Sequence, residues 1–193
     1  DAIRDYFGAS YRGLNLSYVE NTVYAETNNL YSFWLARAEL DDDTLLLEAD
    51  LVFDTQLVSQ LVSMDESNVA IVDLYQPSMD GTVILASGDF AESMVLKSDQ
   101  GRWFDYRTAL KTVNIYRLSK ETLANVILPE MEAFLNDGRT GQYYEAVFAS
   151  LITSGRMEMA VLNTGNKKWA EIDTLDDLKE AEKMFASAPA AIG

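Results

Sequence analysis

Short apolar segments alternate with longer segments of helical periodicity along this chain, and this alternation constrains the fold more than any other feature. It predicts an α/β architecture in which helices cover a sheet. We find no internal repeat, low-complexity tract or linker, so we expect one domain over residues 1–193. A chain of 193 residues is long enough to bury a core of its own.

Apolar runs and capping residues give the expected boundaries of these elements. Within residues 44–53, three consecutive leucines are predicted to form a buried central strand with acidic residues at its C-terminal end, after which Asp54 caps a helix. Further strands are predicted at 16–19, 69–74, 111–117, 157–162 and 169–172, with a hairpin over 81–97. Further helices are predicted after a Thr27 cap, from Ser119 with an interruption at Pro129, over 142–153, and from a capping box at Thr174.

The composition restricts the chemistry that the chain can perform. Cysteine and histidine are both absent, which excludes disulfides, thiolate metal sites and histidine-based catalysis. Carboxylates, lysine, tyrosine, hydroxyl groups or an oxygen-bound cation must then supply any chemistry. The formal net charge of -16 argues against a nucleic acid or an anionic membrane as partner. We expect a cytoplasmic protein, without a membrane span, that binds small molecules.

Two pairs of acidic residues stand at the predicted ends of strands. Glu48 and Asp50 are two residues apart, and so are Glu171 and Asp173. Because side chains alternate along a strand, each pair projects from one face. Ligands of open α/β sheets bind at the carboxyl ends of strands, so the pairs can converge on one magnesium ion. The alternative is that these acids are solvated or cap helices, and the spacing leaves it open.

A lysine and an aromatic cluster are candidates for binding an anion and a cation. Lys111 stands at the start of a predicted strand, where its ammonium can pair with a phosphate. Tyr143, Tyr144 and Glu145 begin a predicted helix, and aromatic faces beside a carboxylate suit an ammonium group. The alternatives are a solvated lysine at a sheet edge and aromatic side chains that only pack.

Amide and hydroxyl groups gather at the start of an earlier predicted helix. Asn29 and Ser32 lie in the segment 27–32, where amides offer both donors and acceptors to the edge of a pyrimidine ring. Plain helix capping is the alternative for the same residues. The sequence therefore offers a candidate nucleotide contact at this helix.

Five segments in a fixed order make the chain resemble the sugar-phosphate nucleotidyltransferase superfamily. Within it, the chain looks like bacterial phosphocholine cytidylyltransferases and the related cytidylyltransferases of phosphonate pathways. The segments that carry this resemblance are 26–32, 46–53, 111–116, 143–145 and 169–178. The resemblance covers nearly the whole chain, to about residue 186.

The resemblance implies a Rossmann-like, three-layer mixed sheet flanked by helices. It also implies Mg²⁺-dependent transfer of CMP from CTP to phosphocholine or a related small phosphate or phosphonate, with release of pyrophosphate. An ammonium-bearing acceptor fits the aromatic cluster best. By position, the resemblance assigns magnesium to Asp50, Asp173 and Glu171, the nucleotide to Asn29 and Ser32, the acceptor's phosphate to Lys111, and its head group to Tyr143, Tyr144 and Glu145.

The chain departs from the family pattern in one respect. The family begins with a strand and a Gly-rich loop that grips the triphosphate, and no such segment occurs here. We therefore expect roughly 60 residues with the first strands to be missing, an upstream segment or fused domain to exist, and the isolated chain to be inactive. Two other hypotheses remain: a non-catalytic domain that binds a small ligand or a partner, and a carboxylate-pair glycosidase.

Overall fold

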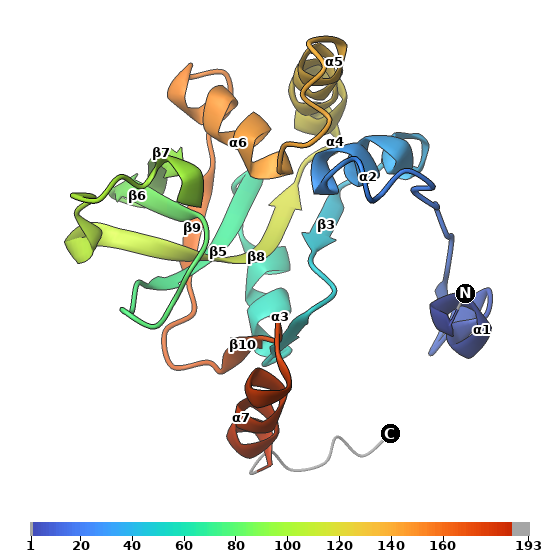
Figure 1. Ribbon diagram of the computed structural model, residues 1–193, viewed down its shortest axis with the longest axis horizontal. Helices are drawn as coiled ribbons and strands as arrows, with labels where there is room; N and C mark the ends of the chain where they lie inside the picture. The colour runs from blue at the N-terminus through green and yellow to red at the C-terminus, as the bar shows by residue number, and fades with distance from the viewer. Residues whose placement is uncertain (1, 187–193) are drawn as a thin grey trace.

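The computed structural model describes residues 2–186 and confirms the α/β class, with a mixed sheet between two layers of helices (Figure 1). The main sheet has six strands in the order β3-β8-β5-β9-β7-β6. Strands β5 and β9 run parallel, and the other pairs described in this sheet are antiparallel. The strands are β3 (Thr44–Leu47), β5 (Asn68–Leu74), β6 (Val83–Ser87), β7 (Phe90–Val95), β8 (Ala109–Leu118) and β9 (Ala160–Asn163).

Two small sheets and the helices complete the described part of the chain. The small sheets pair β1 (Ser10–Tyr11) with β2 (Leu14–Asn15), and β4 (Leu51–Phe53) with β10 (Trp169–Glu171). The helices are α1 (Ala2–Phe7), α2 (Asn29–Leu35), α3 (Gln56–Ser63), α4 (Lys120–Thr122), α5 (Leu128–Asn136), α6 (Tyr144–Thr153) and α7 (Leu175–Phe185). Helix α1 buries no side chain and lies apart from the main sheet in Figure 1.

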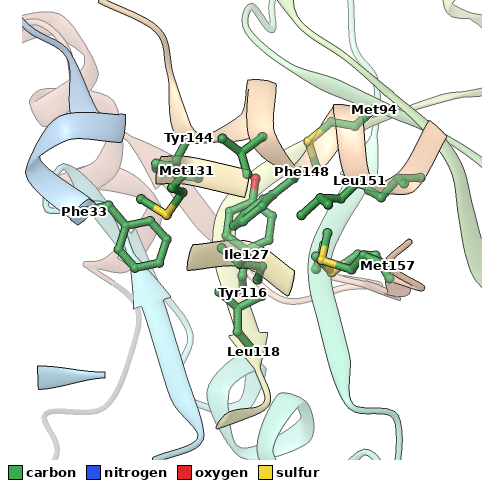
Figure 2. Close-up of a cluster of buried hydrophobic side chains, with 14 of the residues drawn as sticks. Phe33, Met94, Tyr116, Leu118, Ile127, Met131, Tyr144, Phe148, Leu151 and Met157 are labelled. Atoms are coloured by element: carbon green, nitrogen blue, oxygen red, sulfur yellow. The ribbon is translucent and has the colours of Figure 1, made fainter. Parts of the chain in front are cut away.

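Both faces of the main sheet are covered, because side chains alternate along each strand. On one face, Tyr116 of β8 packs with α2, α5 and α6, and its ring meets those of Tyr144 and Phe148 (Figure 2). On the other face, Val113 and Ile115 of β8 pack against α3. Hydrophobic side chains therefore cover both broad faces of the sheet. A ligand can bind only in a gap where neighbouring strands separate.

Strand β8 changes its neighbour partway along its length, and this change opens such a gap. Its C-terminal half pairs with β3 as far as Leu47, opposite Ile115. Its N-terminal half pairs with β6 from Val83 onward, opposite Lys111. The residues of β8 between these two pairings face neither β3 nor β6.

A β-bulge occupies this part of β8. Between two paired positions, β5 advances two residues, from Ala70 to Val72, while β8 advances four, from Tyr116 to Thr112. Within the bulge, Asn114 adopts a φ of 60°, the left-handed region that asparagine tolerates better than most residues. The bulge directs the Asn114 side chain to the gap, where it lines a cavity.

Most predicted elements are confirmed, with small shifts of their ends. Ser119 caps α4 with its hydroxyl, and Thr174 opens α7 in a complete capping box. The helix after Ser119 changes type before Pro129, because a π-helical segment precedes α5, which has this proline in its first turn. The other confirmed elements are β5, the β6–β7 hairpin, β8, α3, α6, β9 and β10.

The leucine triplet forms a strand that ends before the acidic residues, as predicted, but the expectation that this strand is central and buried is wrong. The chain forms β3, breaks at residues 48–50, and then forms β4 in a different sheet. Within residues 2–186, β3 is an edge strand; Leu45 and Leu46 are only partly buried, and Leu47 is exposed. At this break, the Glu48 side chain accepts hydrogen bonds from Asn29 of α2 and Tyr144 of α6.

Three further local predictions, one of a strand and two of helix caps, are also wrong. Residues 16–19 form no strand. The cap of α2 is Asn28 rather than Thr27, since the Asn28 side chain accepts a hydrogen bond from the next backbone N–H. Asp54 does not cap α3 with its side chain, because its carboxylate accepts the backbone N–H of Lys168 and so joins β4 to β10.

Candidate functional site

A cavity of about 920 Å³ lies at the gap between β3 and β6. All nine residues that the sequence assigned to a site line it: Asn29, Ser32, Asp50, Lys111, Tyr143, Tyr144, Glu145, Glu171 and Asp173. They come from α2, the break after β3, β8, the start of α6, and the end of β10. The structure therefore brings together segments that are up to 144 residues apart, from Asn29 to Asp173, while the role of each residue remains a prediction.

Glu48 joins three elements at the floor of this cavity. Its carboxylate accepts hydrogen bonds from the Tyr144 hydroxyl at 2.9 Å, the Asn114 amide at 2.9 Å and the Asn29 amide at 3.3 Å. Burial raises the pKa of Glu48 and the nearby charge of Asp50 adds to this rise, while the hydrogen bonds from Tyr144 and Asn114 oppose it. Glu48 thus fixes the positions of α2, α6 and β8 around the cavity.

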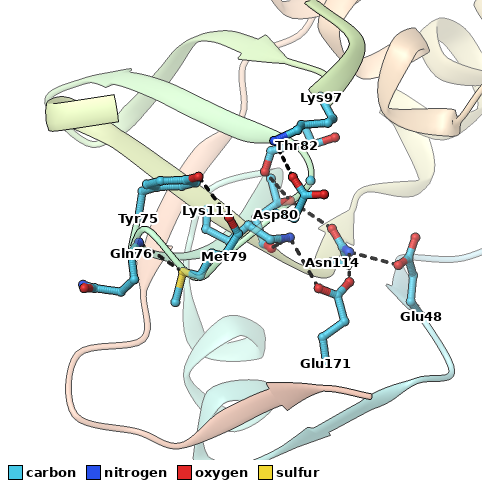
Figure 3. A network of polar contacts seen from close by, with 12 residues as sticks. Glu48, Tyr75, Gln76, Met79, Asp80, Thr82, Lys97, Lys111, Asn114 and Glu171 are labelled. Carbon is cyan, nitrogen blue, oxygen red and sulfur yellow. Dashed lines mark hydrogen bonds and ion pairs between the residues drawn. The ribbon is translucent and has the colours of Figure 1, made fainter. Parts of the chain in front are cut away.

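Lys111 is buried, which rules out the alternative of a solvated lysine at a sheet edge. Its exposed fraction is 2%, and its ammonium donates a hydrogen bond to the backbone oxygen of Thr112 at 2.9 Å. The ammonium lies 3.8 Å from the carboxylate of Glu171 (Figure 3). Gly81, with a φ of 101°, leaves room for it, since a Cβ atom there would lie 3.1 Å from the Lys111 nitrogen. The cavity therefore holds one buried cation.

The two predicted acidic pairs face this same cavity. The backbone N–H of Ile172 donates to the backbone oxygen of Asp50 at 2.9 Å, which brings the end of β10 beside the start of β4. Burial raises the pKa of Glu171, Lys111 opposes this, and the charges of Asp173 and Asp50 add to it. The acids therefore concentrate negative charge at one edge of the cavity.

These acids fit a magnesium ion only as part of a site that the substrate completes. Among residues 2–186, no group of three or more acidic side chains is arranged to hold a metal ion. Mg²⁺ commonly binds one or two carboxylates and takes its other oxygens from water and substrate phosphates. Asp50 and Asp173 supply two such carboxylates on the cavity wall, so the donor set matches that kind of site.

In the aromatic cluster, the Tyr144 ring belongs to the core, and the Tyr143 ring belongs to the cavity wall. Tyr144 is 2% exposed and packs among Phe33, Tyr116 and Phe148, so its hydroxyl rather than its ring face serves the cavity. Tyr143 is 52% exposed and lines the cavity. The structure thus corrects the expectation that both tyrosine rings present open faces.

Glu145 is a buried carboxylate of the cavity with one oxygen that has no hydrogen-bond donor among the described residues. It is 5% exposed, and its Oε2 atom has no hydrogen-bond partner among the residues that the structure describes. Burial raises its pKa to about 7, and the charge of Glu48 adds to this shift, while Thr82 and Lys111 oppose it. A buried acceptor without a partner is costly, which marks Glu145 as a position where a ligand can supply a donor.

The two candidate nucleotide residues have partners within the protein. The Asn29 side-chain oxygen accepts the backbone N–H of Tyr144 at 2.9 Å, at the N-terminus of α6, while its amide donates to Glu48. Ser32 accepts a hydrogen bond from the Asn21 amide at 3.1 Å. Asn29 therefore caps α6, a helix remote in sequence, and it still lines the cavity.

The sequence did not identify several residues of this cavity. Asn114 is an asparagine among Val, Ile and Tyr in a strand, where asparagine is disfavoured, and this was the available signal. Lys97 and Asp80 form an ion pair at the rim, with nitrogen and oxygen 2.5 Å apart. Residues 80 and 97 flank the β6–β7 hairpin, which the sequence predicts, but no local pattern shows that these two side chains meet beside the cavity.

Comparisons with known proteins agree with this architecture. No protein-family model matches the chain. Over 188 residues and 96% of its length, it is 32% identical to a CMP-5'-(3-aminopropyl)phosphonate synthase from Streptomyces rubellomurinus. The chain spans 30% of that relative's length. Within residues 2–186, no helix is long and apolar enough to cross a bilayer.

Solved structures with a similar fold include three nucleotidyl-transferring enzymes. A CTP:phosphocholine cytidylyltransferase from Streptococcus pneumoniae matches with a TM-score of 0.69 and 16% identity, over 95% of this chain and 72% of that one. An inositol-1-phosphate CTP transferase from T. maritima matches with a TM-score of 0.69 and 17% identity, over 100% and 72%. A UDP-glucose pyrophosphorylase with bound UDP-glucose gives a TM-score of 0.70 and 12% identity, over 96% and 76%.

Proposed function

The resemblance to the sugar-phosphate nucleotidyltransferase superfamily is confirmed by sequence and by fold, and on that premise we propose that this chain forms most of the active site of a cytidylyltransferase. The acceptor is a small phosphonate or phosphate, and the donor is CTP. The observation that carries the proposal is that one cavity is lined by all nine residues that the motifs assigned to a site. In the reaction, an acceptor oxygen attacks the α-phosphorus of CTP, the bond to the β-phosphate oxygen breaks, and pyrophosphate leaves.

The residues act mainly by positioning two anions and offsetting their charge. Lys111 is the buried cation of the cavity, and we assign it to the acceptor's phosphonate or phosphate oxygens. Asp50 and Asp173, with Glu171 nearby, would hold Mg²⁺. When bound, this ion would offset the negative charge that develops on the phosphates in the transition state.

An acceptor that carries an ammonium group suits this cavity better than a sugar phosphate. Glu145 has a buried oxygen without a partner, and an ammonium N–H supplies the missing donor. Tyr143 lines the same cavity with a half-exposed ring that can contact a cation. The relative named for an aminopropyl phosphonate favours an aminoalkylphosphonate, and the neighbour named for phosphocholine makes that the second candidate.

The nucleotide is assigned to the start of α2. Asn29 and Ser32 line the cavity beside Glu48, so their remaining donors and acceptors can meet the base or ribose. The choice of CTP comes from the cytidylyl-transferring relatives. The activity of the whole protein is part of the proposal, because the chain spans 30% of its curated relative.

A pyrophosphate-release assay on a panel of acceptors tests this function. The 193-residue chain is assayed alone and together with any residues that precede it in its gene, with CTP, Mg²⁺ and one acceptor at a time. We expect turnover with 2-aminoethylphosphonate or 3-aminopropylphosphonate, less with phosphocholine, and least with glucose 1-phosphate. The isolated chain is expected to bind ligands without turnover.

Two results would contradict the proposal. Preference for glucose 1-phosphate over every ammonium-bearing acceptor would overturn the assignment of Glu145. Ligand binding without pyrophosphate release by the longest form of the protein would favour the alternative of a non-catalytic binding domain.

A further inference from the structure

Asn114 places its side-chain amide between two carboxylates that come from different sheets. The amide nitrogen donates to Glu48 at 2.9 Å and to Glu171 at 3.3 Å (Figure 3). Glu48 follows β3 of the main sheet, whereas Glu171 belongs to β10 of the small β4–β10 sheet. An amide NH₂ group has two N–H donors, so it can serve both acceptors at once.

The orientation of this amide is determined by its neighbours. The Asn114 oxygen lies 2.9 Å from the Thr112 hydroxyl, which can donate to it. Carboxylates mostly accept hydrogen bonds, so the nitrogen must face Glu48 and Glu171. The residue is 6% exposed and has a left-handed backbone, which disfavours most other side chains. The bulge of β8 therefore presents a donor to both acids.

The hydrogen bond from Asn114 also restrains Glu171 relative to Lys111. The ammonium and the carboxylate are 3.8 Å apart, longer than the charge-assisted hydrogen bond of about 2.8 Å that such a pair can form. One N–H of Lys111 goes to the Thr112 backbone. A closer contact with Glu171 would engage a second N–H and neutralise the cation.

We propose that Asn114 is a positioning residue that holds Glu171 back from Lys111 and so keeps the ammonium available for the acceptor's phosphonate or phosphate. This inference rests on the proposed role of Lys111. It predicts that Glu171 closes onto Lys111 when the amide is removed. The acceptor then competes with a full ion pair. The start of α2 keeps its contact with Glu48, which still accepts hydrogen bonds from Asn29 and Tyr144, so we expect CTP binding there to change less.

The geometric test is a pair of crystal structures, of the wild-type protein and of Asn114→Gly. Glycine adopts a positive φ without strain, so the substitution removes the amide and leaves the bulge intact. We expect the Lys111–Glu171 distance to fall to about 2.8 Å in the variant. An unchanged distance would overturn the inference. If Asn114→Gly does not fold, Asn114→Ala also removes the amide without adding a charge, at the cost of backbone strain, and is expected to give the same closure.

The kinetic test separates positioning from general damage. We expect Asn114→Gly to raise the acceptor KM about tenfold or more, because the acceptor loses roughly one charge-assisted hydrogen bond. The same substitution should change the CTP KM by less than about twofold. Asn163→Gly is the matched control, because the exposed Asn163 side chain accepts a hydrogen bond from the nearby Gly165 N–H and does not line the cavity. An equal rise in both KM values would indicate a structural role and contradict the inference.

A double-mutant cycle tests whether Asn114 acts through Glu171. In a Glu171→Gln background, no carboxylate remains to close onto Lys111, so Asn114→Gly should change the acceptor KM by less than about twofold. Additive effects would contradict the mechanism. If the wild-type protein turns over no acceptor, the proposed function fails, while the Lys111–Glu171 distance still decides the role of Asn114.

Discussion

The hydroxyl of Tyr144 donates a hydrogen bond to the carboxylate of Glu48 at 2.9 Å, across 96 residues of sequence. Tyr144 is a core residue at the start of α6, and Glu48 stands at the break between β3 and β4. This contact links the hydrophobic core to the polar floor of the cavity. The stability of the fold and the shape of the site are therefore coupled at this point.

Tyr144→Phe should lower the free energy of unfolding by about 1–2 kcal/mol, because the half-buried Glu48 carboxylate loses one of its donors. Urea unfolding monitored by circular dichroism measures this change. Tyr143→Phe is the matched control, since Tyr143 is 52% exposed, and it should change stability by less than about 0.5 kcal/mol. Equal effects of the two substitutions would show that the Glu48 contact contributes nothing.

The raised pKa of Glu145 predicts a pH-dependent penalty on folding. Its pKa rises from 4.5 to about 7 in the fold, so the folded state binds more protons than the unfolded state between these values. Stability should therefore fall as pH rises through this window, by at most about 3 kcal/mol. Glu145→Gln should remove that loss and be more stable than wild type at alkaline pH. Unfolding free energies measured across the pH range test this, and parallel curves for the two proteins would contradict it.

The same group predicts how ligand binding depends on pH. An ammonium-bearing acceptor prefers the ionised form of Glu145, so its affinity should rise as pH increases through about 7. Calorimetric titration of 2-aminoethylphosphonate at several pH values measures this. Glu145→Gln should weaken binding and flatten the pH dependence around that value. An unchanged profile in the variant would assign the ammonium to another group.

Gly81→Ala should displace Lys111, because the added Cβ atom would lie 3.1 Å from its ammonium nitrogen. Gly138→Ala is the matched control: both glycines have positive φ, but no atom lies within 4 Å of a Cβ at Gly138. Both variants should lose about 1–2 kcal/mol of stability from backbone strain. Only Gly81→Ala should also raise the acceptor KM. A similar rise in both variants would contradict a specific effect on Lys111.

Asp50→Ala and Asp173→Ala should each lower the transfer rate by orders of magnitude in the longest active form of the protein, because each removes a carboxylate assigned to Mg²⁺. Rates measured over a range of Mg²⁺ concentrations should show a higher requirement for the ion. Asp176→Ala is the control, since that exposed side chain pairs with Lys179 of the same helix and does not line the cavity. Near-normal rates for both cavity variants would remove the metal assignment.

Local patterns predicted much of the fold. Alternating apolar segments predicted β5, β8 and the β6–β7 hairpin, and the capping box at Thr174 predicted the start of α7. Helical spacing puts Leu175, Leu178 and Ala181 on one side of α7, but only Ala181 is buried, while Leu175 and Leu178 are 76% and 39% exposed. Periodicity indicates which residues share a face, but it does not indicate whether that face is covered.

The site was predictable where motifs supplied it and hidden where long-range pairing created it. The motifs identified residues that share one cavity, although their spacing alone left every role open. The proposed role of Asn114 depends on a bulge of β8 against β5, at the point where β8 exchanges β3 for β6 as its other neighbour. Such an exchange involves strands distant in sequence, so no local pattern around Asn114 could reveal it.

A crystal structure of the protein with Mg²⁺, a non-hydrolysable CTP analogue and 2-aminoethylphosphonate tests the central claim most directly. We predict that both ligands occupy the cavity between β3 and β6, with the phosphonate oxygens in contact with the Lys111 ammonium and the α-phosphate close to Asp50 and Asp173. Ligands bound outside this cavity, or a phosphonate remote from Lys111, would contradict the account.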